Sequence, residues 1–137
     1  MKEKRGLYVH IPFCLRKCAY CDFVSCSGME RYFDRYIEQV GKEAKNYEGE
    51  AADTVFIGGG TPTVLTAEQI LRLGKNISDY IEIDGNAEYT IESNPKTLTE
   101  DKLEAIKKIG VNRISIGVQS FNDAELKAVG RVHTAAE

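Results

Sequence analysis

The sequence lacks a long apolar segment, an excess of basic residues and a phosphate-binding motif, and each absence excludes a class of function. No apolar run approaches the roughly 20 residues that span a bilayer, so no transmembrane helix is expected. The net charge of −3 over 137 residues provides no electrostatic basis for binding nucleic acid. Neither G-x-G-x-x-G nor Gly-Lys-Ser/Thr occurs, which argues against a phosphate-binding loop.

The N-terminus and the cysteine content together indicate the compartment. The charged segment 1–5 is not followed by the apolar stretch of a signal peptide, so no export is expected. Four cysteines in a chain without an export signal suggest a reducing environment, in which thiols remain free to bind metal. We therefore predict a cytoplasmic protein.

The length and composition are those of one globular domain. A hydrophobic content of 42% and a charged content of 28% are ordinary for a soluble protein, and 137 residues suffice for one modest core. No internal repeat, low-complexity segment or domain boundary is evident. We expect residues 1–137 to form a single domain.

Apolar patterns predict four strands, each followed by a helix. Alternating strands and helices indicate an α/β fold with a parallel sheet. A capping box is expected at Thr66 and Gln69, and the segment 83–86 has the composition of a turn. Helical periodicity places Tyr32, Leu71 and Leu103 on core-facing sides. The strands are expected at 7–13, 54–57, 88–92 and 113–118, and the helices near 29–47, 66–81, 99–109 and 122–130.

Three of the four cysteines lie in one short loop directly after the first strand. Cys14, Cys18 and Cys21 are spaced C-x3-C-x2-C, and three thiolates so close together can point inward only if the loop wraps a metal or cluster. Iron–sulfur clusters are usually held by four thiolates, so three cysteines leave one iron without a local ligand. Such an open coordination position is typical of catalytic metal centres.

Two other interpretations of the cysteines stay open at this stage. The thiols could be free and buried as small apolar groups. They could also form a structural zinc site completed by Cys26 or His10, although zinc sites usually have two distant C-x2-C pairs and no second pair is present. We expect Cys26 to be a free thiol and His10 to be a hydrogen-bonded core histidine, and the sequence assigns no role to His133.

Each conspicuous motif follows a predicted strand. The cysteine loop follows the first, the segment 58–63 the second, 92–95 the third and 117–120 the fourth. Parallel α/β folds form their sites at the carboxyl ends of the strands, so we expect one site there. Three consecutive glycines at 58–60 would let the backbone approach a ligand closely, the alternative being a tight bend of the chain.

Taken in order, these motifs resemble those of the radical S-adenosylmethionine (SAM) enzymes. The strings Tyr-Val-His-Ile-Pro-Phe-Cys and Tyr-Cys-Asp-Phe are similar to the branch that contains oxygen-independent coproporphyrinogen oxidases and HemW-type heme chaperones. The resemblance implies a partial TIM-like (βα)6 barrel with only its first four βα units present. It also implies a [4Fe–4S] cluster on Cys14, Cys18 and Cys21, with SAM on the fourth iron.

The same resemblance implies a set of SAM-contacting residues. The set consists of Tyr8, Gly59, Gly60, Thr61, Glu92, Gln119 and Arg131. For Gln119 and Arg131, the alternatives are loop capping and a solvated surface charge.

The sequence departs from its relatives at two points. Phe23 stands where true coproporphyrinogen dehydrogenases have an additional cysteine, which favours a HemW-like role in heme binding and delivery to apoproteins over porphyrinogen decarboxylation. Whether the protein is an enzyme therefore stays open, and a flavodoxin or ferredoxin is the implied electron donor. The family is also more than twice this long, so we predict a fragment truncated on its C-terminal side, with an unpaired strand edge that could support a homodimer.

Overall fold

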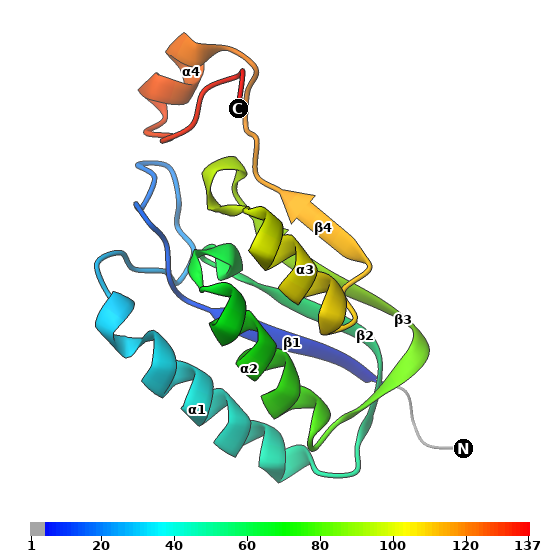
Figure 1. Cartoon of the computed structure of the whole chain (residues 1–137). Coiled ribbons are helices and arrows are strands. Elements are labelled where there is room, and N and C mark those ends of the chain that lie inside the picture. The colour runs from blue at the N-terminus through cyan, green and yellow to red at the C-terminus, as the bar shows by residue number, and fades with distance from the viewer. Residues whose placement is uncertain (1–4) are drawn as a thin grey trace.

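The computed structural model describes residues 5–137, which form one four-stranded parallel sheet with the strand order β1-β2-β3-β4 (Figure 1). The strands are β1 (Arg5–Ile11), β2 (Ala51–Gly59), β3 (Glu82–Ser93) and β4 (Arg113–Ile116). The helices are α1 (Phe33–Ala44), α2 (Ala67–Ser78), α3 (Glu100–Lys108) and α4 (Asp123–Ala128), with short 3-10 turns at Glu30–Tyr32, Lys45–Tyr47, Pro62–Val64 and Pro95–Thr97.

Helices α1, α2 and α3 cover one face of the sheet (Figure 1). Alternate residues of β1 and β2 point toward these helices and are buried, among them Val9, Ile11, Val55 and Ile57. This period of two is what a strand with one covered face requires. No helix within residues 5–137 covers the opposite face, on which Tyr8 of β1 is exposed. The helices contribute Ile37, Ile70, Leu73, Ile77 and Ile106 to the core.

The predicted helices form, but three of the side chains expected in the core are exposed. The capping box is present, since Thr66 Oγ1 accepts from the Gln69 amide at 3.2 Å and Gln69 Oε1 accepts from the Thr66 amide at 3.0 Å. Tyr32, Leu71 and Leu103 are exposed, so their predicted burial was wrong. Each lies at the border of an apolar stripe, where periodicity alone does not determine which side chains the sheet covers.

The turn predicted at residues 83–86 is instead part of β3. Ala52 pairs with Ile83 and Thr54 pairs with Glu88, so that Asp84–Ala87 of β3 stands opposite Asp53 alone. Asp84 Oδ1 accepts from the Asn86 amide at 2.9 Å, a local bond typical of turns. The turn residues therefore produce a bulge inside a continuous strand, because pairing with β2 resumes on both sides of it.

The edges of the sheet are β1 and β4. Within residues 5–137, β4 pairs only with β3, which agrees with the predicted unpaired edge. β4 ends at Ile116, two residues earlier than predicted, because the chain then turns away from β3. In the part of the chain that the structure describes, no helix has the length and apolarity needed to cross a bilayer.

Candidate functional site

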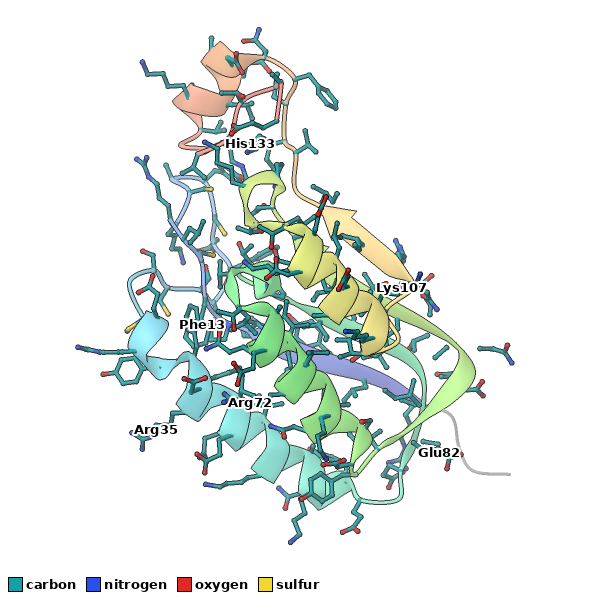
Figure 2. The ribbon with its side chains drawn as sticks, viewed as in Figure 1. Phe13, Arg35, Arg72, Glu82, Lys107 and His133 are labelled. Atoms are coloured by element: carbon teal, nitrogen blue, oxygen red, sulfur yellow. The ribbon has the colours of Figure 1, made fainter. Side chains whose placement is uncertain are left out.

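The loops that follow the four strands gather at one end of the sheet. The cysteine loop (residues 14–26), the turns at Pro62–Val64 and Pro95–Thr97, and α4 with its flanking segments all lie there (Figure 1). In Figure 2, Phe13 and His133 lie toward this end, whereas Glu82 marks the opposite end, where β3 begins. A parallel sheet brings these loops together because all of its strands run the same way.

A cavity of about 280 Å³ lies among these loops and is called the site cavity below. Nine of the ten residues that the sequence singled out line it, and they come from five different loops and strand ends. They are Cys14, Cys18, Cys21, Gly59, Gly60, Thr61, Glu92, Gln119 and Arg131.

Tyr8 is the one predicted residue that the structure does not bring into the site cavity. It lies on the uncovered face of β1, is 57% exposed, and its ring stacks on Phe56 at 6.1 Å between centroids. Its hydroxyl lies 2.9 Å from His10 Nδ1. Desolvation and, secondarily, the Glu92 carboxylate raise the pKa of Tyr8, so the two side chains are close enough to interact.

The cysteine loop is closed at its base by main-chain hydrogen bonds. The Cys14 amide donates to Cys26 O at 2.9 Å, and the Cys26 amide donates to Pro12 O at 2.8 Å. His10 Nε2 lies 2.8 Å from Val24 O, so His10 is hydrogen-bonded as predicted and ties the loop to β1. It is half-buried and lies outside the core, so its predicted core placement was wrong. Cys26 lies in this closure, its thiol directed at Pro12 O at 3.3 Å, and it does not line the site cavity.

The three cavity thiols are free and half-buried. Thr61 Oγ1 lies 3.7 Å from Cys14 Sγ, and Arg131 Nη1 lies 3.5 Å from Cys18 Sγ. Within residues 5–137, no three His, Cys, Asp or Glu side chains are grouped so that they could hold a metal ion. Three cysteine thiols that line one cavity, with hydrogen-bond donors beside two of the sulfurs, are the type of donor that holds iron–sulfur clusters.

The glycine run packs against the base of the cysteine loop. A Cβ on Gly60 would meet Phe13 O at 2.5 Å and Cys14 Sγ at 3.0 Å, so only glycine fits there. Gly59 has φ 115°, which side-chain-bearing residues rarely adopt. The amide of Gly59 donates to Glu92 Oε2 at 2.9 Å. Close packing of the chain itself therefore explains part of the glycine run, alongside the access that it provides to the site cavity.

Gln119 has a strained backbone. Its φ of 70° is the only positive φ of a non-glycine residue among residues 5–137. The Ser120 amide donates to Val118 O at 2.9 Å across it, as in a γ-turn. Strain of this kind persists where the surrounding structure enforces it and is frequent at functional sites. Here it accompanies a polar side chain that lines the site cavity.

Arg131 is not a solvated surface charge, and that alternative was wrong. Its Nη2 donates to Asn94 Oδ1 at 2.6 Å and to Gly117 O, and its Nε is buried without a partner among the described residues. His133, which the sequence left unassigned, is buried with Nε2 3.0 Å from Val118 O. The contacts of Arg131 with Gly117 O and of His133 with Val118 O hold the segment after α4 against the segment that follows β4.

Several residues that line the site cavity had no predicted role. Asn94 lies between Thr61 and Arg131 and hydrogen-bonds to both. Tyr20 also lines the cavity, where burial and then the Cys18 thiol raise its pKa while Arg131 acts in the opposite direction. Asn94 could have been noticed because it belongs to the 92–95 motif, but its partners are distant in the sequence.

Comparisons with known proteins find relatives along almost the whole chain. The profile described as "Radical SAM superfamily" matches residues 8–137. The chain is 40% identical over 137 residues to the "Heme chaperone HemW" of Lactococcus lactis, covering 100% of this chain and 36% of that protein. It is 38% identical to the Escherichia coli protein of the same name, covering 96% of this chain and 36% of the relative. The chain thus spans about a third of the length of these relatives.

A solved structure has the same fold. It is described as "Coproporphyrinogen III oxidase (HemN) from Escherichia coli is a Radical SAM enzyme", and it superposes with a TM-score of 0.87 at 33% identity. The superposition covers 96% of this chain and 32% of that one. It confirms the predicted α/β fold and its parallel four-stranded sheet.

Proposed function

The chain belongs to the radical SAM superfamily, and from this membership we propose that its site cavity binds a [4Fe–4S] cluster and SAM. The observation that carries the proposal is the convergence of nine predicted residues, from five separate segments, on one cavity. A chance grouping of cysteines would not place the glycine run, Glu92, Gln119 and Arg131 around the same space.

Cys14, Cys18 and Cys21 are the residues that would hold the cluster. When bound and reduced, such a cluster would supply one electron for the cleavage of SAM to methionine and a 5′-deoxyadenosyl radical, chemistry that belongs to the cofactors rather than to the protein. The chain's contribution is to shield the three thiolates in a half-buried loop and to place hydrogen-bond donors beside two of them.

The remaining cavity residues would bind SAM. Arg131 Nε is a buried donor without a partner among residues 5–137, and a guanidinium suits a carboxylate group. The Glu92 carboxylate lines the same cavity and would accept from an amino group, while Gly59 and Gly60 leave room for a ligand near the main chain. Tyr8 would act from outside the cavity, through its proximity to Glu92.

For the complete protein we propose a HemW-like role, in which heme is bound and delivered to apoproteins in the cytoplasm. The support is the 40% identity to a heme chaperone and the presence of Phe23 in place of a cysteine. A flavodoxin or ferredoxin would supply electrons. In the 137-residue chain, β4 pairs only with β3 among residues 5–137, and its free edge would be available for a homodimer contact.

The second candidate is oxygen-independent coproporphyrinogen oxidation. It is favoured by the solved structure of an oxidase that matches at a TM-score of 0.87. The discriminating residue is Phe23, which lines the site cavity and is largely exposed. Propionate decarboxylation of coproporphyrinogen would establish the oxidase, whereas stoichiometric transfer of heme to an apoprotein without SAM turnover would establish a non-catalytic chaperone.

The first experiment is anaerobic reconstitution of the chain with iron and sulfide. We expect about four irons per chain and an electron paramagnetic resonance spectrum that changes when SAM is added. Cys18→Ala should lose the cluster, while the matched variant Cys26→Ala should retain it, because the Cys26 thiol lies outside the site cavity. Equal iron loss in both variants, or uptake of zinc in place of iron, would contradict the proposed site.

A further inference from the structure

Asn94 connects two residues that come from distant parts of the chain. It follows β3 directly, and its side chain makes one hydrogen bond at each end. Oδ1 accepts from Arg131 Nη2 at 2.6 Å, and Nδ2 donates to Thr61 Oγ1 at 2.7 Å. An arginine can only donate, which fixes the amide orientation, because the oxygen must face Arg131 and the nitrogen must face Thr61.

Both partners of Asn94 face a thiol of the cysteine loop. Thr61, which is only 2% exposed, directs its hydroxyl at Cys14 Sγ at 3.7 Å. Arg131 directs Nη1 at Cys18 Sγ at 3.5 Å. The side-chain amide of Asn94 is thus hydrogen-bonded to both of the residues whose donors approach these two sulfurs.

The main chain of Asn94 is anchored by the turn that follows it. The main-chain N–H of Asn94 donates to Thr97 Oγ1 at 3.2 Å, and the Thr97 hydroxyl lies 2.8 Å from the main-chain carbonyl oxygen of Asn94. Lys102 Nζ then donates to Thr63 O at 2.8 Å and to Thr97 O at 3.1 Å, which ties the turn after β2 to the turn after β3. A side chain anchored in this way can determine the orientation of its partners.

We propose that Asn94 is a positioning residue that directs the Thr61 hydroxyl proton to Cys14 and the Arg131 guanidinium to Cys18. Because Asn94 donates to Thr61 Oγ1, the proton of Thr61 is free to point at sulfur. Hydrogen bonds to ligating sulfurs tune the reduction potential of a cluster. The inference rests on the proposed function for its effect on the cluster, while the orientation of Arg131 is a property of the chain alone.

The diagnostic variant is Asn94→Asp, which has nearly the same shape but cannot donate. Its carboxylate would accept the Thr61 proton, withdraw it from Cys14, and pair with the Arg131 charge. The matched control is Asn112→Asp, at the amino end of β4. Asn112 also uses both ends of its amide, accepting from the Tyr89 amide at 3.0 Å and donating to Ala87 O at 2.8 Å.

The first measurement is the reduction potential of the reconstituted cluster, followed by electron paramagnetic resonance. We expect Asn94→Asp to retain iron and to show a lower potential than the wild type, with a larger shift than Asn112→Asp. Added negative charge and a lost hydrogen bond to sulfur both disfavour reduction. Equal potentials in the two variants would overturn the inference for the cluster.

The second measurement requires no cluster. Urea unfolding of the metal-free chain is compared for Asn94→Ala, Arg131→Ala and the double variant. We expect the unfolding constants to deviate from additivity by at least about twofold, as they do for residues in direct contact. Additive effects would overturn the positioning role. If the effects are non-additive but the chain takes up no iron on reconstitution, the role of Asn94 is supported and the proposed function is refuted. Failure of the inference and failure of the proposed function are therefore distinguishable.

Discussion

Substitution of Gly60 by alanine tests whether the glycine run is required by packing against the cysteine loop. The added Cβ would lie 2.5 Å from Phe13 O, whereas real Cβ contacts are essentially never closer than 3.0 Å. The carbonyl must therefore move by at least 3.0 − 2.5 = 0.5 Å. The same carbonyl accepts from the Thr61 amide at 2.7 Å, and this bond would be strained or lost.

The expected cost follows from these two effects. Overpacking of a close-packed region costs about 1–3 kcal/mol, and loss of one buried hydrogen bond adds about 1 kcal/mol. We therefore expect Gly60→Ala to lower the free energy of unfolding by about 2–4 kcal/mol, a large share of the ~5–15 kcal/mol typical of a domain. It should also reduce iron uptake, because Cys14 Sγ lies only 3.0 Å from the new Cβ.

Urea unfolding monitored by circular dichroism measures the loss, and iron analysis after reconstitution measures the effect on the site. Gly85→Ala is the matched control, since a Cβ there meets no atom within 4 Å. If the two variants unfold at the same urea concentration, the close approach of Gly60 to Phe13 does not constrain the fold, and the steric argument is refuted.

Three further predictions concern other parts of the chain. Tyr89 is buried, its hydroxyl has no hydrogen-bond partner among residues 5–137, and burial raises its pKa from 10.0 to about 12. Its ionisation therefore favours the unfolded chain, and about 3 kcal/mol of stability present below pH 10 should be lost toward pH 12. Tyr89→Phe should remove this loss without destabilising the chain at pH 7, and an unchanged pH profile would contradict the prediction. Gln119→Gly should be more stable to urea than Gln119→Ala by about 1 kcal/mol, because glycine adopts φ 70° without strain; equal midpoints would argue against backbone strain. Asn122→Ala should destabilise α4 by about 1 kcal/mol, since Asn122 Oδ1 caps the amides of Ala124 and Glu125, and unchanged hydrogen exchange of those amides would exclude the cap.

The local features of this protein could be predicted from the sequence because they depend on residues close together in the chain. The capping box at Thr66 and Gln69 needs only three residues of separation, and the C-x3-C-x2-C spacing places three thiols in one loop whatever the rest of the chain does. Strand–helix alternation likewise indicated a parallel sheet, and the parallel direction of the strands indicated that their loops would meet.

Some predictions failed where burial or pairing decides the outcome. The segment 83–86 has turn residues, yet pairing with β2 on both sides keeps it within β3 as a bulge. Leu71 lies at the border of an apolar stripe, and its exposure depends on how far the neighbouring elements cover it. Tyr8, by contrast, lies on the uncovered face of β1 and outside the site cavity, and its role at the SAM site stays a prediction.

The order of the motifs, the number of strands and the end of the sheet where the site lies follow from the amino-acid sequence, because backbone periodicity and chain direction are local properties. Which side chains are in contact depends on the tertiary fold. Asn94 bridges Thr61, 33 residues away, and Arg131, 37 residues away. Contacts of this kind depend on strand register and on loop conformations that no local pattern encodes, and they direct the hydrogen bonds toward the Cys14 and Cys18 thiols.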